Sequence, residues 1–115
     1  MKTPLHQRFH RLASEMAIES RHKRDAYPEN SDVHQFHDGK SHAFHDLSVA
    51  VRDGDIEALD ALDPDRAVAS MLEEHAEGAR QRRDANADKR REREFHSGRQ
   101  AGYIAFLEAW RDAQP

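Results

Sequence analysis

An internal repeat is the feature that most constrains what this chain can fold into. Residues 36–53 recur 59 positions later as residues 95–112, and six of the 18 positions are identical. The first copy opens with the letters FHDGK and the second with FHSGR, and both copies end in Arg-Asp. Two copies of one pattern predict two similar structural elements that occupy equivalent places in the fold.

The matched positions share one face of a helix, because successive residues are turned by about 100°. They are Phe36, Gly39, Ala43, Phe44, Leu47, Ala50 and Val51 in the first copy, and Phe95, Gly98, Gly102, Tyr103, Phe106, Ala109 and Trp110 in the second. Glycine inside a helix costs up to about 1 kcal/mol relative to alanine, so its presence here indicates close packing of two backbones. We expect the two helices to pack face to face as a pseudo-twofold pair. A ligand groove between the small residues is the alternative.

Local signals divide the rest of the chain into helices. Thr3-Pro4 and Asp63-Pro64 each place a capping side chain before a proline at the first helical position. Asp32 and Gln35 have the spacing of a capping box, and Gly54 is a helix stop signal. The predicted helices cover residues 4–26, 33–53, 56–62, 64–84 and 88–112.

The stretch 73–94 holds no large apolar side chain. Pairs such as Arg80 and Asp84 have the i, i+4 spacing that supports a solvated helix, so we favour helix here. One long helix kinked near residues 84–88 and a break at that place both stay open. The sequence thus predicts an all-α fold, a small bundle with residues 1–115 in one domain. It contains the duplicated helix motif at 33–53 and 92–112 and a long charged helix.

Composition excludes several classes of function. The chain has 115 residues, a net charge of −4 and no cysteine, which excludes disulfides, thiolate metal sites and cysteine nucleophiles. Its longest run without a polar residue is 101–107, whereas a membrane span needs about 20 residues. We expect a cytoplasmic protein without a membrane partner or secretory leader. No catalytic or cofactor-binding motif is present, so we expect a protein that is not an enzyme and binds no cofactor.

Charge is distributed unevenly along the chain. Residues 52–79 contain nine acidic and two basic side chains, whereas residues 80–94 contain seven basic and four acidic ones. The acidic candidates for binding a protein partner are Asp53, Asp55, Glu57, Asp60, Asp65, Glu73, Glu74 and Glu77. The basic candidates for an alternative function, contact with nucleic-acid phosphates, are Arg80, Arg82, Arg83, Lys89, Arg90, Arg91 and Arg93. Carboxylates at helical spacing can also imitate a phosphate backbone.

The chain has nine histidines, and four of them lie between residues 34 and 45. The side chains of His34, Asp38, His42 and His45 follow steps of four, four and three, so they share the helix face opposite the apolar one. Imidazole and carboxylate together suit Zn²⁺, Ni²⁺ or Fe²⁺, although a structural zinc site usually takes four ligands. A metal-binding function is therefore a second alternative, beside a plain solvated face.

The pattern aromatic-x-x-Gly-x-x-x-small-aromatic at 36–44 and 95–103 resembles short helical proteins that phages and other mobile elements encode. The resemblance covers about 20 residues in each copy and implies no reaction. Many such proteins bind a host or defence protein, as inhibitors of the anti-CRISPR type do. We therefore expect a non-enzymatic interaction protein with a host or defence protein as its partner. Self-association as a homodimer is consistent with the small number of large apolar residues, and exposed aromatics such as Tyr27 are further candidates for the interface.

Overall fold

Four long helices begin and end close to the signals in the sequence. The computed structural model describes residues 3–113, and its elements are α1 (Pro4–Asp25), α2 (Asp32–Arg52), the 3-10 helix η1 (Glu57–Asp60), α3 (Pro64–Ala85) and α4 (Arg90–Asp112). The all-α prediction is confirmed, and the four long helices agree with their predicted ranges to within two residues. The predicted helix 56–62 is only the short η1.

Capping side chains account for three of the helix starts. Thr3 and Asp63 each accept a hydrogen bond from the backbone N–H three residues further on, at 3.2 and 3.3 Å. Ser31, at 3.1 Å, caps α2 in the same way, so the N-cap lies one residue before the predicted Asp32. The predicted capping box does not form, because the side chain of Gln35 donates to the carbonyl oxygen of Glu29 at 2.8 Å. Gly54 follows the end of α2 with φ of +79°, a left-handed conformation that favours glycine.

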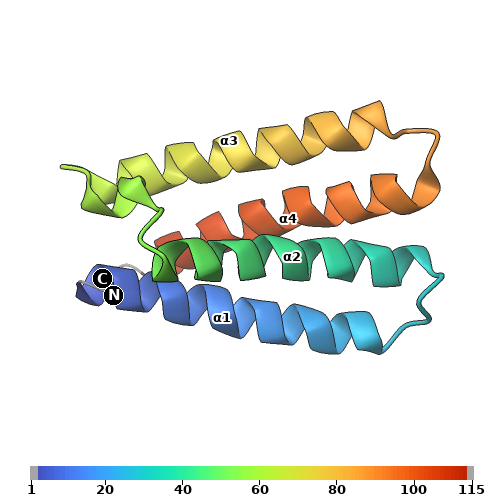
Figure 1. Cartoon of the computed structure of the whole chain (residues 1–115), viewed down its shortest axis with the longest axis horizontal. Coiled ribbons are helices and arrows are strands. Elements are labelled where there is room, and N and C mark those ends of the chain that lie inside the picture. Colours follow the sequence, from blue (N-terminus) through green and yellow to red (C-terminus); the bar gives the residue numbers. More distant parts are fainter. Residues whose placement is uncertain (1–2, 114–115) are drawn as a thin grey trace.

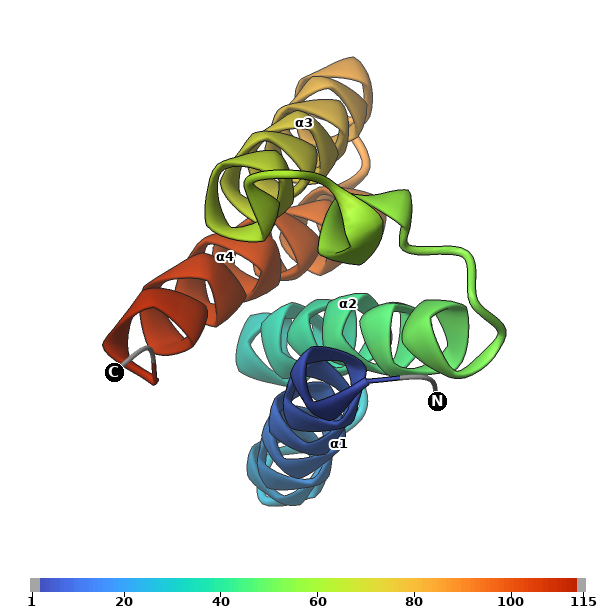
Figure 2. The same cartoon turned by 90° about the vertical axis from the view of Figure 1, so that its left-hand side faces the viewer.

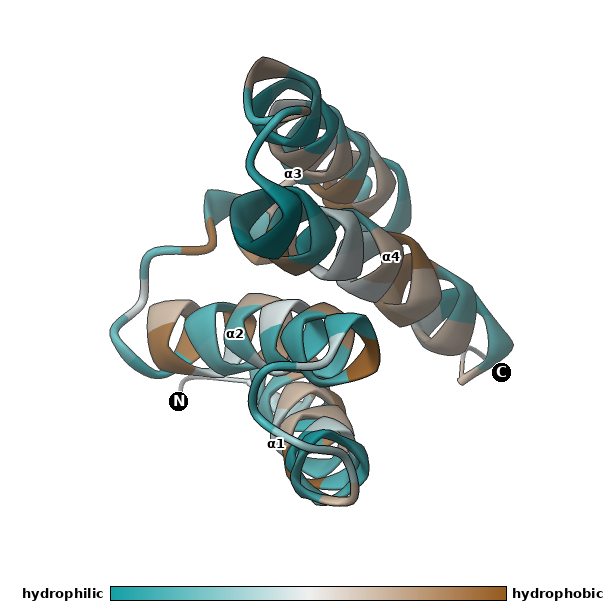
Figure 3. Ribbon diagram, turned by 90° about the vertical axis from the view of Figure 1, so that its right-hand side faces the viewer, coloured by the Kyte–Doolittle hydropathy of each residue, from teal (hydrophilic) through white to brown (hydrophobic). Residues whose placement is uncertain are grey.

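The helices form two antiparallel hairpins, α1–α2 and α3–α4 (Figure 1). The inner helices α2 and α4 run in the same direction and cross, whereas α1 and α3 lie on opposite outer sides (Figure 2). A connector, residues 53–63, carries η1 along one side from the end of α2 to the start of α3. In Figure 3, hydrophilic colours dominate the turn between α3 and α4 and the first residues of α4.

The two inner helices meet backbone to backbone at the repeated glycines. A Cβ atom on Gly39 would collide with the carbonyl oxygen of Phe95 and lie 2.9 Å from the backbone nitrogen of Arg99. A Cβ atom on Gly98 would collide with the carbonyl oxygen of Phe36 and lie 3.1 Å from the backbone nitrogen of Lys40. Each contact is the other shifted by 59 residues, which is the signature of a twofold relation. The predicted pseudo-twofold pair is confirmed.

The same contact excludes the alternative of a ligand groove between the small residues. The facing helix occupies the space beside Gly39 and Gly98, and the Cβ atom of Ala43 would lie only 3.1 Å from a Cβ atom on Gly102. The matched apolar face is instead the core, with Phe44, Leu47, Val51, Tyr103, Phe106 and Trp110 all buried.

The duplication extends over both hairpins, which the sequence analysis missed. The buried residues of α1 are His6, Phe9, Ala13, Ala17 and Ser20, and those of α3 are Val68, Leu72, Ala76 and Ala79. The last four of α1 and the four of α3 correspond one to one at the offset of 59. Over positions 9–53, twelve of 45 residues are identical to the residue 59 positions later, without a gap. The detectable signal was RHKRDA at 21–26 and RQRRDA at 80–85.

The charged stretch 73–94 spans parts of two antiparallel helices, so the structure selects the break near residues 84–88 over one continuous, kinked helix. α3 ends at Ala85 and the chain reverses through residues 86–89. The side-chain amide of Asn86 donates a hydrogen bond of 2.7 Å to the carbonyl oxygen of Arg82, which satisfies one of the free carbonyls at the helix end. The stretch also contributes to the core without large side chains, because Ala76 and Ala79 are buried.

Substitution of Gly39 or Gly98 by alanine tests the backbone contact. We expect either variant to lose at least about 2 kcal/mol of unfolding free energy, because the added methyl group meets rigid backbone. Urea unfolding followed by circular dichroism measures this loss.

Gly78→Ala is the matched control, because Gly78 lies inside α3 with open space around the new methyl group. We expect this variant to gain about 0.5–1 kcal/mol from helix propensity. Equal effects at Gly39, Gly98 and Gly78 would contradict the backbone contact.

Candidate functional site

The eight acidic candidates all lie on the surface, along the connector 53–63 and the first two thirds of α3 (Figure 1). Three of them have a partner. Asp53 pairs with the adjacent Arg52 at 3.3 Å, Asp60 lies 3.5 Å from His6, and Glu77 pairs with Arg80. The other five form no ion pair within residues 3–113, and they are Asp55, Glu57, Asp65, Glu73 and Glu74. These eight residues, called the acidic end below, keep most of their charge available for a partner.

Leu62 is a fully exposed apolar side chain at the acidic end. If the predicted helix 56–62 had formed, Leu62 would lie on the same face as the buried Leu59, three residues earlier, and would be buried as well. The chain instead becomes extended at Ala61, with ψ of 161°, so Leu62 faces solvent between Asp60 and Asp63. The sequence gives no local signal for this change, and Leu62 was not among the predicted site residues.

An open groove of about 600 Å³ lies between the start of α3 and the end of α4. Its lining includes Asp63, Asp65, Arg66, Glu73, Trp110 and Arg111. Trp110 is almost fully buried and belongs to an aromatic cluster, with its ring centroid 5.4 Å from that of Phe9. The acidic end thus has a concave part with carboxylates and guanidinium groups on its walls.

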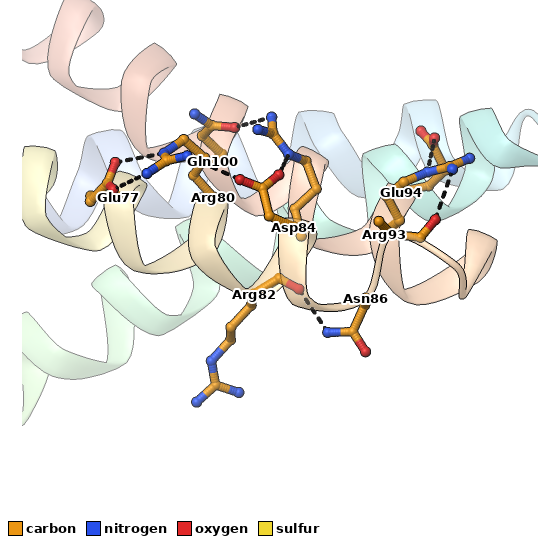
Figure 4. Close-up of polar contacts among 10 residues, drawn as sticks. Glu77, Arg80, Arg82, Asp84, Asn86, Arg93, Glu94 and Gln100 are labelled. Carbon is orange, nitrogen blue, oxygen red and sulfur yellow. Dashed lines mark hydrogen bonds and ion pairs between the residues drawn. The ribbon is translucent and has the colours of Figure 1, made fainter.

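Four of the seven basic candidates form ion pairs with carboxylates of this chain. Arg80 lies between Glu77 and Asp84, with distances of 2.8 and 3.0 Å (Figure 4). This arrangement raises the pKa of Arg80 and lowers the pKa of Glu77 through their hydrogen bonds. Arg83 contacts Asp84 at 3.0 Å and the side chain of Gln100 at 2.9 Å, so it ties α3 to α4.

The remaining basic candidates divide into paired and unpaired groups. Arg90 binds Asp32 at 2.6 Å and thereby joins the starts of α4 and α2, and Arg93 pairs with Glu94 at 3.5 Å. Arg82, Lys89 and Arg91 form no ion pair in the described part of the chain, and the guanidinium of Arg82 extends away from the paired residues in Figure 4. Four of the seven cations are therefore neutralised by carboxylates of this chain, which weakens the case for a phosphate-binding surface.

The four predicted metal ligands contact α1 or one another. His34 donates a hydrogen bond of 2.9 Å to the carbonyl oxygen of Arg24 and so caps the end of α1. Asp38 accepts one of 3.1 Å from Arg24, and His42 lies 3.7 Å from Asp38. His45 accepts one of 3.2 Å from Arg21. No group of three or more potential ligands among residues 3–113 is placed to hold a metal ion.

Two equivalent histidines, His37 and His96, are partly buried beside the α2–α4 contact. Burial lowers the pKa of both, and the nearby cations Lys40 and Arg99 lower it further. The Nδ1 atom of His37 is buried without a hydrogen-bond partner in the described structure, and its ring stacks on the half-exposed Tyr27 at 6.0 Å. The repeat identified His37 and His96 as equivalent positions, but it gave no signal that their pKa values would be lowered.

No protein-family model, curated protein or solved structure matches this chain. Among residues 3–113, no helix is long and apolar enough to cross a membrane.

We expect the protein to lose stability as the pH falls through the range in which free histidine gains its proton, near pH 6.5. His37 and His96 bind a proton less readily in the folded state than in the unfolded one, so acid favours unfolding. Their contribution is fully present above that range and is lost as the pH falls toward their lowered folded pKa values. Urea unfolding at pH 7.5 and pH 5.5 measures the loss, and His37→Gln with His96→Gln is expected to reduce it. Proton NMR titration that places both folded pKa values at or above 6.5 would contradict this account.

Proposed function

We propose that this protein is a non-enzymatic binding protein whose acidic end docks onto a basic surface of a protein partner. The observation that carries the proposal is Leu62, fully exposed between Asp60 and Asp63. An apolar anchor surrounded by charge is a common composition of an interface, with the apolar part desolvated and the rim polar.

Electrostatics supports a basic partner. Five carboxylates of the acidic end form no ion pair among residues 3–113, whereas four of the seven basic candidates do. The unpaired charge therefore accumulates along the connector and α3, and it attracts a positively charged surface over distances of about one Debye length. Such attraction raises the association rate and disfavours acidic partners.

A host or defence protein that binds nucleic acid has a surface of the required kind. The carboxylates of the acidic end would then occupy the place of phosphate groups, as an inhibitor or adaptor of the kind that phages encode would do. A twofold dimer, in which the acidic end of each copy contacts basic residues of the other, is the homodimeric form of the same proposal.

Charge reversal tests the acidic end. The variant Asp55→Lys, Glu57→Lys, Glu73→Lys changes three unpaired carboxylates, and the control variant Glu15→Lys, Asp46→Lys, Glu108→Lys changes the net charge equally at other exposed positions. Tagged proteins are incubated with host lysate after nuclease treatment, and retained proteins are identified by mass spectrometry. We expect a partner that the wild type and the control retain and that the first variant loses.

Leu62→Ser tests the apolar anchor with the same partner. Loss of a buried leucine contact costs about 1.5–3 kcal/mol, so we expect the dissociation constant to rise about tenfold or more. The proposal is refuted if the variant Asp55→Lys, Glu57→Lys, Glu73→Lys still retains the partner. Partners that disappear with nuclease, and with reversal of Arg82, Lys89 and Arg91, would assign the protein to nucleic-acid contact instead.

A further inference from the structure

The groove between α1 and α2 holds a group of cationic and imidazole side chains that the acidic end does not use. It has a volume of about 200 Å³ and is lined by Arg21, Arg24, Ser41, His42 and His45. The group brings together two histidines and one serine of α2 with two guanidinium groups of α1. Both α1 and α2 therefore contribute to this groove, and the sequence pattern of α2 alone does not predict the part of α1.

The second hairpin provides an internal comparison, because each lining residue has an equivalent 59 positions later. The equivalents are Arg80, Arg83, Gln100, Ala101 and Ile104. The two arginines are kept, but both histidines are replaced by apolar residues. At these five positions, therefore, only the first hairpin combines guanidinium and imidazole groups.

The two hairpins also differ in the carboxylates beside the first arginine. Arg80 is held by Glu77 and Asp84 (Figure 4). The position equivalent to Glu77 is Ile18, which is 53% exposed and carries no charge. The equivalent of Asp84 is Asp25, which binds Arg24 at 2.9 Å.

Arg21 consequently keeps its charge available. Its only hydrogen bond among the described residues goes to the Nδ1 atom of His45, at 3.2 Å. A neutral imidazole that accepts at Nδ1 carries its proton on Nε2, so His45 retains an N–H donor. The nearby carboxylates, Asp25 and Asp38, are both bound by Arg24, at 2.9 and 3.1 Å.

We infer that this groove binds a single phosphate group, either free or carried by a small phosphomonoester. The guanidinium of Arg21 can offer paired N–H donors to phosphate oxygens, and the Nε2–H group of His45 adds a further donor. The groove is smaller than the range of about 300–1,000 Å³ that is usual for larger ligands, so it suits one such group.

The test uses Ile18→Glu, which gives Arg21 the carboxylate that Glu77 gives Arg80. Its matched control is Ile18→Gln, which has the same shape without the charge. Ile18 is exposed, so both variants are expected to fold, and circular dichroism checks this. Binding of inorganic phosphate and of glycerol phosphate is measured by calorimetry at constant ionic strength, and amide chemical shifts locate the site.

We expect wild type and Ile18→Gln to bind with shifts at Arg21, Ser41, His42 and His45, and Ile18→Glu to bind at least tenfold more weakly. The double variant His42→Ala, His45→Ile, which installs the residues of the second hairpin, is expected to lose binding as well. Tighter binding of glycerol phosphate than of inorganic phosphate assigns the site to phosphomonoesters, and equal binding assigns it to free phosphate. Absence of binding to the wild type, equal binding by Ile18→Glu and Ile18→Gln, or shifts confined to other residues would overturn the inference.

Discussion

The backbone contact between α2 and α4 is the constraint on which the rest of the structure depends. Where Gly39 and Gly98 face the opposite helix, no side chain separates the two backbones. Helices that pack so closely need few large residues between them, and the outer helices cover them with small ones such as Ala13 and Ala79. This explains how a chain with 35% charged residues builds a core around a limited set of aromatic and aliphatic side chains.

The repeat made the central pair predictable, because its spacing placed aromatic and small residues on one helix face. The equivalence of the outer helices was harder to detect, since Phe9 and Val68, or Ala13 and Leu72, share burial and not identity. The reversal at residues 86–89 has no proline or glycine to mark it. Leu62 is exposed because η1 ends at Asp60, whereas helical periodicity predicts that it is buried.

The surfaces were predictable only in part, because ionic partners are a tertiary property. The exposure of the acidic end followed from its composition. The pairing of Arg90 with Asp32, which are 58 residues apart, did not follow from any local pattern. The spacing of the histidines on α2 predicts one shared surface, but α1 supplies its neighbours: the carbonyl oxygen of Arg24 accepts the hydrogen bond of His34, and Arg21 donates to His45. A pattern on one helix therefore locates a surface without defining its chemistry.

Duplication followed by divergence gives this small protein two copies of one scaffold with different surfaces. The arginines at 21 and 24 recur at 80 and 83, in the same place on the hairpin. In the second hairpin they bind carboxylates and the facing helix, which is a structural role. In the first, Ile18 stands in place of a glutamate, and Arg21 forms no ion pair with a carboxylate in the described part of the chain. Because the two backbones are equivalent, any difference in ligand binding between the hairpins is caused by their side chains. One half of the molecule therefore serves as the control for the other.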